Sequence, residues 1–303
     1  MSRDPFSSDS RQPETDSRER ERPDSLPAEQ IAAERPEQQG IDVREIRALK
    51  PEREDAPRAH TLGDRTFLLR ESELHTLGEL GKFRVIAAPD LARFAYASDN
   101  ARMERDIRRL RGQGLVSERT LPVSERKTLR VVALTKIGKR VIEKTGHLPE
   151  NQKVYHGIVK PREAKHDAEL YRLFHAESER IQSAGGKPLR VVLDYELKRD
   201  LNRDRAQLRD RQKDPQEMES LAARHGLIVV DGKIPLPDMR IEYQTADLEL
   251  QRVDLELATR HYRPRGVATK AKAGFSLYSH REEASRLRRI LDEQELTARI
   301  LML

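Results

Sequence analysis

The chain has no cysteine, no internal repeat and no long apolar run. Without cysteine it can form neither a disulfide nor a thiolate zinc site, and this composition suits a reducing cytoplasm. The missing repeat excludes a solenoid. No apolar stretch approaches the length of about 18 residues that marks a membrane-spanning helix, and the first residues lack the apolar core of a secretory signal. We therefore expect a cytoplasmic protein with no membrane segment.

What the sequence does contain is charge. Its 303 residues include 58 basic and 52 acidic side chains, giving a formal net charge of +6 and a pI near 9.5. The length allows about two domains. The positive balance favours a polyanionic partner, although the near equality of the two signs makes local clustering more informative than the total.

Residues 1–62 differ from the rest of the chain in composition. They are rich in Pro, Ser, Glu, Arg and Asp and poor in apolar side chains, so they cannot bury enough surface to offset the entropy of ordering. We predict a disordered charged tail over 1–62, with one short amphipathic helix as an option over 41–49. A tethering arm that finds DNA or a partner is the alternative interpretation.

Residues 63–146 show the spacing of a small helical domain with a hairpin. Leu74, Leu77 and Leu80 recur at helical spacing, and Pro89 suits the first turn of a second helix. Ser98 is predicted to cap a third helix that ends at Gly112 or Gly114.

The third helix has two faces. Met103, Ile107 and Leu110 fall at positions that face a core. The remaining surface is basic, and its DNA-binding candidates are Arg102, Arg105, Arg108 and Arg109. Two strand-like segments follow at 115–121 and 128–134, joined by a turn that carries Arg126 and Lys127. Thr135 then caps a short helix that Gly146 closes.

These three helices, the two-stranded wing and the returning helix resemble the winged-helix domains of MarR-like DNA-binding proteins. The resemblance implies that the third helix enters the major groove of double-stranded DNA and that the wing tip contacts the neighbouring backbone. Two alternatives stay open: a winged helix used to bind protein, with its arginines merely solvated, and a homodimer.

A linker is predicted over 147–162, where two prolines interrupt any periodicity. The second domain, 163–303, begins with a helix that Gly185 and Gly186 stop. His166, Asp167 and Glu169 near its start could touch a site, although solvation on the helix surface is the favoured interpretation. The stretch 188–200 is interpreted as a strand in which Asp194 and Glu196 lie on the same side. Further strands are expected from Asp238 and over 248–257, then a helix near Val267, a short strand over 275–278 and a closing helix. The fold class is therefore α/β and α+β, with a mixed sheet in the second domain.

Three carboxylates are the candidates for chemistry in this second domain. Asp238 follows a proline, and Asp254 and Glu256 stand two apart on one face of a strand. Hard divalent cations such as Mg²⁺ or Mn²⁺ prefer oxygen ligands of this kind. The same pattern also occurs at an ordinary sheet edge.

The order of elements from residue 163 resembles the PD-(D/E)XK fold of restriction-endonuclease-like domains. Together with the winged helix, it resembles the replication-relaxation family of plasmids and other bacterial mobile elements. The resemblance implies a DNA-binding protein that acts in replication, transfer or its regulation. It also implies phosphodiester hydrolysis, with Asp238, Asp254 and Glu256 as metal ligands and a lysine that stabilises charge.

One residue of that motif is displaced. No lysine stands two positions after Asp254 or Glu256, because those places hold Glu256 and Ala258. Lys270 or Lys272 could reach the site from the following helix instead, and Lys270 is the catalytic candidate. The sequence favours a nuclease-like domain without catalysis, with a Mg-dependent DNA endonuclease as the alternative.

Overall fold

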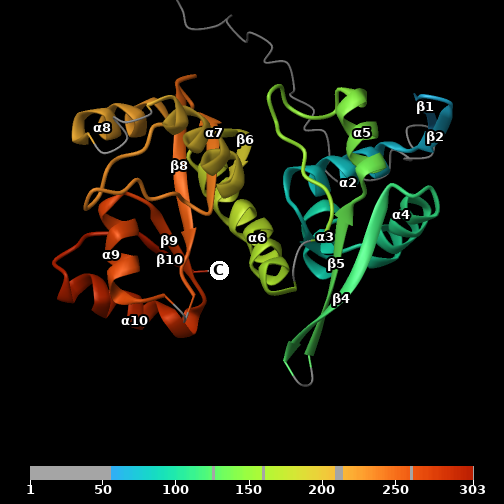
Figure 1. Cartoon of the computed structure of the whole chain (residues 1–303). Helices are drawn as coiled ribbons and strands as arrows, with labels where there is room; N and C mark the ends of the chain where they lie inside the picture. Colours follow the sequence, from blue (N-terminus) through green and yellow to red (C-terminus); the bar gives the residue numbers. More distant parts are fainter. Residues whose placement is uncertain (1–55, 125–126, 159–160, 209–213, 260–261, 303) are drawn as a thin grey trace, which may run out of the picture. The chain divides into compact units, whose positions relative to one another are not determined.

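The computed structural model describes residues 56–124, 127–158, 161–208, 214–259 and 262–302 (Figure 1). The tail up to residue 55 and the optional helix over 41–49 lie outside these ranges. The predicted boundary at residue 62 is wrong, because β1 (Arg58–Leu62) pairs antiparallel with β2 (Arg65–Leu69). Gly63, with a φ of 58°, turns the chain between the two strands.

The winged-helix-like region follows directly. Its elements are α2 (Glu71–Lys82), β3 (Ile86–Ala87), α3 (Ala88–Ala95), α4 (Asn100–Gly112), β4 (Val116–Ser124), β5 (Lys127–Leu134) and α5 (Lys136–Thr145). The strands form one antiparallel sheet in the order β3-β5-β4. Thr135 accepts a hydrogen bond from the backbone N–H of Gly138, and Gly146 takes a left-handed conformation, so both predicted ends of α5 are found.

Residues 161–302, the predicted second domain, form a mixed five-stranded sheet with helices, within a compact unit that spans Pro51–Leu303. This domain comprises α6 (Pro161–Ser183), β6 (Lys187–Leu193), α7 (Asp194–Gln207), α8 (Pro215–Arg224), β7 (Met239–Gln244), β8 (Leu250–Leu257), α9 (Pro264–Lys272), β9 (Ser276–Ser279), α10 (Arg281–Glu293) and β10 (Ile300–Met302). The strand order is β10-β9-β8-β7-β6. β6, β7 and β8 are antiparallel neighbours, whereas β8, β9 and β10 run parallel.

Two predictions of secondary structure are wrong in this domain. Asp194 does not lie in a strand but begins α7, where it stands in the first turn, a position that the helix dipole makes favourable for a carboxylate. The closing helix does not reach the C-terminus. It ends at Glu293, Glu295 takes a φ of 51°, and residues 300–302 return as an added parallel strand.

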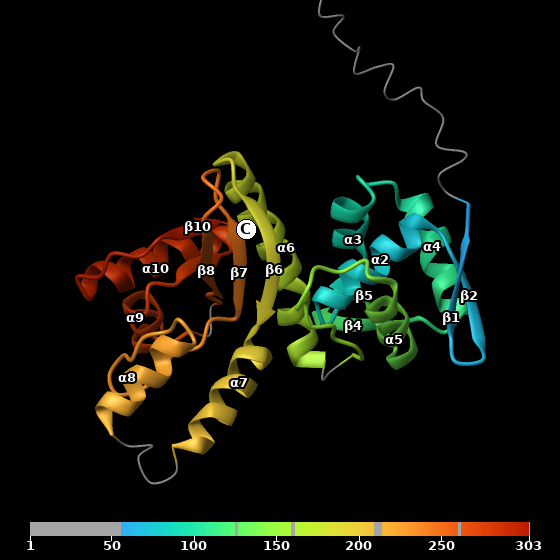
Figure 2. The ribbon, with the colours of Figure 1, turned by 90° about the horizontal axis from the view of Figure 1, so that it is seen from above.

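Helix α6 lies between the winged-helix-like region and the sheet in both views (Figures 1 and 2). Tyr171 on α6 makes an edge-to-face contact with Phe83, with ring centroids 5.1 Å apart. Ile181, almost three turns further along α6, belongs to the same apolar core, which continues into Val191 and Ile241 of the sheet. One helix therefore supplies core residues to both regions. No helix in the described ranges has the length and apolar character needed to cross a bilayer.

Candidate nucleic-acid interface and carboxylate site

Helix α4 is held by its apolar face and presents its basic face. Met103, Ile107 and Leu110 are buried, as predicted. The N-cap, however, is Asp99 and not Ser98: its carboxylate accepts a hydrogen bond from the backbone N–H of Arg102 at 2.9 Å, and Ser98 takes a φ of 68°. Both residue types cap well, so the sequence pattern alone did not separate them.

The four predicted arginines of α4 do not share one environment. Arg102, Arg105 and Arg108 are exposed, three residues apart. Arg105 and Arg108 have no hydrogen bond or ion pair with any described residue, so their guanidinium groups point to solvent. Arg109 is different, because its guanidinium contacts Asp106 at 2.8 Å and the buried Glu73 of α2 at 3.0 Å. It therefore fastens α4 to α2.

The wing is joined to α4 by charge. Arg130 of β5 forms an ion pair with Glu104 of α4 and lies 3.6 Å from Glu118 of β4. Lys127, at the start of β5, is exposed. Arg126, the other candidate at the wing tip, lies outside the described residues. Among the described residues, Glu104 of α4 and Glu118 of the wing are therefore both paired with arginines.

In the second domain, the hairpin of β7 and β8 brings two predicted site residues together. Because Met239 pairs with Leu255, the preceding Asp238 lies opposite Glu256. The backbone N–H of Asp238 donates to Glu256 Oε2 at 3.2 Å, and the N–H of Leu257 donates to Asp238 Oδ2 at 2.9 Å. The two carboxylates are therefore fixed by backbone groups at one end of the sheet.

Lys270 reaches this pair from α9. Its Nζ lies 2.8 Å from the Glu256 carboxylate and 2.5 Å from the carbonyl oxygen of Leu236. Tyr262 also donates a hydrogen bond to Glu256. Lys272 points elsewhere and lies 4.0 Å from Asp231. Of the two lysines considered from sequence, Lys270 is the one that the fold places beside the acids.

Asp254 does not join the cluster. Arg240 lies opposite it on β7 and holds its two oxygens at 2.6 and 2.8 Å. The same guanidinium donates to the carbonyl oxygens of His225 and Gly226. Asp254 is therefore part of a structural ion pair, a role that its position two residues before Glu256 did not indicate.

Of the two interpretations of His166, contact with a site is the one that the structure supports, because this residue of α6 faces the carboxylates. Its Nε2 lies 3.4 Å from Asp238 Oδ1. Burial alone would lower the pKa of His166, but the hydrogen bond and charge of Asp238 outweigh it and raise the pKa to about 9. Burial raises the pKa of Glu256 above its ordinary range, and the Asp238 charge adds to that effect while Lys270 opposes it. The sequence offered no signal for Tyr262.

The fit of this site to a metal ion is limited to two ligands. No group of three or more His, Cys, Asp or Glu suited to a metal occurs within the described ranges. Mg²⁺ is nevertheless commonly held by one or two carboxylates together with substrate phosphates. Lys270 and His166 already place positive charge beside the two carboxylates and offset the repulsion between Asp238 and Glu256. Asp238 and Glu256 fit the protein's share of such a site, and Asp254 does not belong to it.

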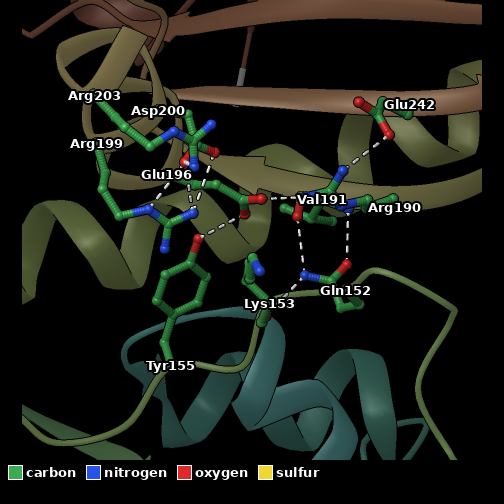
Figure 3. A network of polar contacts seen from close by, with 10 residues as sticks. All are labelled: Gln152, Lys153, Tyr155, Arg190, Val191, Glu196, Arg199, Asp200, Arg203 and Glu242. Carbon is green, nitrogen blue, oxygen red and sulfur yellow. Dashed lines mark hydrogen bonds and ion pairs between the residues drawn. The ribbon is translucent and has the colours of Figure 1, made fainter. Parts of the chain in front are cut away.

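The predicted linker is fixed to the edge of the sheet (Figure 3). Gln152 accepts a hydrogen bond from Val191 N–H at 3.0 Å and donates one to its carbonyl oxygen at 2.9 Å. Tyr155 donates to Glu196 at 3.3 Å, and Glu196 is ion-paired with Arg190. The polar groups of strand β6 at Val191 are thus satisfied by a side chain, which protects part of an edge strand.

The fold and these sites define a mixed α/β protein with a winged-helix-like region followed by a mixed five-stranded sheet. No family model matches the chain, and no curated protein matches it. Among solved structures, it is similar to the crystal structure of Bacillus subtilis PadR in complex with operator DNA. The identity is 16%, the match covers 51% of this chain and 78% of that chain, and the TM-score is 0.22. A likeness this weak carries no argument about function.

Proposed function

We propose that this chain binds double-stranded DNA through α4 and the wing. The observation that carries the proposal is the pair Arg105 and Arg108: both are exposed on one helix face, and neither has an ion pair or hydrogen bond with a described residue. Arg109, by contrast, is occupied by Glu73 and Asp106. Arginine matches phosphate oxygens and the guanine edge in geometry, and a helix of this width fits the major groove.

The experiment replaces Arg105 and Arg108 by alanine and measures duplex affinity by fluorescence anisotropy over a range of salt. Each phosphate contact contributes about 0.9 to the slope of log K against log salt, so losing two contacts lowers the slope by about 1.8 and weakens binding about 20-fold at 0.2 M salt. The matched control replaces the exposed Arg281 and Arg288 of α10. Equal affinity and slope in the wild type and the Arg105/Arg108 variant would refute the proposal.

For the second domain we propose a PD-(D/E)XK nuclease-like fold. The supporting feature is the element order α6, β6, β7, β8, α9, β9, with a parallel β8–β9 pair. Combined with the winged helix, this order supports membership of the replication-relaxation family, with a role in the replication, transfer or regulation of a plasmid or other mobile element. DNA binding stands independently of this assignment.

A metal-dependent DNA endonuclease is the second candidate, favoured by the convergence of Lys270 on Glu256 and Asp238. A bound Mg²⁺ or Mn²⁺ would polarise the scissile phosphate. Asp238 and Glu256 would hold the ion, and Lys270 would place positive charge where negative charge develops. In this candidate function, Lys270 of α9 takes the place of the lysine that the PD-(D/E)XK motif has two positions after its second acid.

Its test incubates supercoiled plasmid with the protein and Mg²⁺ or Mn²⁺. Wild-type protein nicks the plasmid, Asp238→Asn loses at least 100-fold in rate, and Asp247→Asn, an exposed substitution in the β7–β8 turn, retains activity. If the wild type and Asp238→Asn nick the plasmid at equal rates, the nicking activity comes from a contaminant or from another site.

A further inference from the structure

The wing does not stand free, because α6 packs against its sheet. Leu121 of β4 and Val131 and Ala133 of β5 form one apolar cluster with Ala164 and Ala168 of α6. The small side chains of α6 allow the helix to approach the strands closely. The strands of the wing and the first turns of α6 are therefore packed against each other.

A cleft of about 360 Å³ opens along this junction. It is bounded on the wing side by β5 and on the other side by α6, with α3 at its end. Its charged lining residues are Asp90, Lys127, Lys165, Glu169 and Arg172. The cleft is thus shared between the region proposed to bind DNA and the nuclease-like domain.

Arg172 is the cation beside the two acids of the cleft, since both Asp90 and Glu169 act on its guanidinium. Arg172 Nε donates to Asp90 Oδ1 at 2.8 Å, and Glu169 Oε1 lies 3.6 Å from Nε2 of His280. The two lysines are not compensated: Lys127 and Lys165 are exposed, and neither has an ion pair or hydrogen bond within the described part of the chain. Two like charges facing one cleft repel each other, and an anion between them removes that cost.

We propose that this cleft binds the phosphate backbone of the same duplex that α4 contacts, with Lys127 and Lys165 as its cationic groups. The inference rests on the proposed DNA binding and extends the interface from the winged helix onto the second domain. Lysine is a flexible point charge that suits backbone phosphates more than base edges. Arg130 joins β5 to α4 on one face of the wing, and α6 packs on the opposite face, so a duplex that reaches both contacts passes the wing.

The test compares four proteins for binding to a 30-base-pair duplex of mixed sequence by anisotropy in a salt titration: the wild type, Lys127→Glu, Lys165→Glu and the double variant. Each single variant lowers the salt slope by about 1, and the double variant lowers it by about 2 and weakens binding at least 20-fold at 0.2 M salt. The matched control carries Lys187→Glu and Lys233→Glu, which change two exposed lysines outside the cleft. Circular dichroism and thermal unfolding check that each variant is folded.

The decisive protein is Lys165→Glu, because Lys127 belongs to the wing and Lys165 to the second domain. If Lys165→Glu keeps the wild-type slope of log K against log salt, the proposed cleft contact is refuted, whereas DNA binding by the wing is not. If duplex affinity falls in Lys165→Glu but not in the Arg105/Arg108 alanine variant, DNA binding by the cleft is supported and DNA binding by α4 is refuted.

Discussion

His175 gives the strongest pH-dependent prediction. This residue of α6 stacks on Phe94 of α3, with ring centroids 4.1 Å apart and planes 3° apart. Its Nε2 is buried without a hydrogen bond and lies 3.9 Å from Glu79. Burial lowers the pKa of His175 to about 4; the charges of Glu79 and Asp90 raise it, those of Lys82 and His75 lower it further, and burial dominates.

The sign of the effect on stability follows from this direction. The unfolded chain binds a proton at His175 with a pKa near 6.5, whereas the folded chain does so only near 4. Stability from this residue is therefore full above about pH 6.5 and is lost as pH falls towards 4. The whole effect is about 3 kcal/mol, of which about 2 kcal/mol is lost between pH 7 and pH 5.

The assay compares His175→Phe with the wild type by urea unfolding at both pH values. Phenylalanine keeps the stacked ring and removes the titrating group. The comparison must be made between proteins, because Asp167 and Glu256, whose pKa values burial raises, change the stability of both in the opposite direction. The variant gains about 2 kcal/mol on the wild type from pH 7 to pH 5. A difference that stays constant within about 0.5 kcal/mol would refute a neutral, buried His175.

Two further predictions concern packing and backbone satisfaction. A Cβ on Gly138 would lie 2.0 Å from the carbonyl oxygen of Leu115, so Gly138→Ala costs about 2–3 kcal/mol in chemical unfolding. A Cβ on Gly112 would have no neighbour within 4 Å, so Gly112→Ala raises the free energy of unfolding by about 0.5 kcal/mol. Equal effects of the two substitutions would contradict the close approach of Gly138 to Leu115. Gln152→Ala leaves the backbone N–H and carbonyl of Val191 without their hydrogen-bond partner, so it lowers the free energy of unfolding by about 2 kcal/mol. Amide hydrogen exchange at Val191 also becomes faster. Unchanged exchange there would argue against the role of Gln152 in capping the edge strand.

The sequence predicted the winged-helix-like region well because its signals are local. Met103, Ile107 and Leu110 mark the buried face of α4 by period alone, and Thr135 and Gly146 mark both ends of α5. Arg109 shows the limit of this reasoning. It stands on the same helix as its exposed neighbours, yet its guanidinium pairs with Glu73 of α2. That contact is set by tertiary packing, which the sequence pattern of α4 does not show.

In the second domain, register decided which acids meet. Asp238 and Glu256 become neighbours because the β7–β8 turn pairs Met239 with Leu255. The same register places Arg240 opposite Asp254 and so removes that acid from the cluster. A sequence pattern shows that Asp254 and Glu256 share a strand face, but it does not show the partner across the strand. The direction of Lys270 depends in addition on how α9 packs.

The proposed backbone contact and the histidine that faces the carboxylates are adjacent residues of α6. Lys165 lines the cleft beside the wing, and His166 faces Asp238. Neighbouring positions on a helix differ by about 100° and 1.5 Å of rise, so the cleft and the carboxylate site lie on adjoining sides of one rigid turn. A backbone held at Lys165 would thus be presented towards Asp238, Glu256 and Lys270. This arrangement gives DNA binding by the winged helix a physical route to the carboxylates, since Ala164 and Ala168 fix the same turn to the wing.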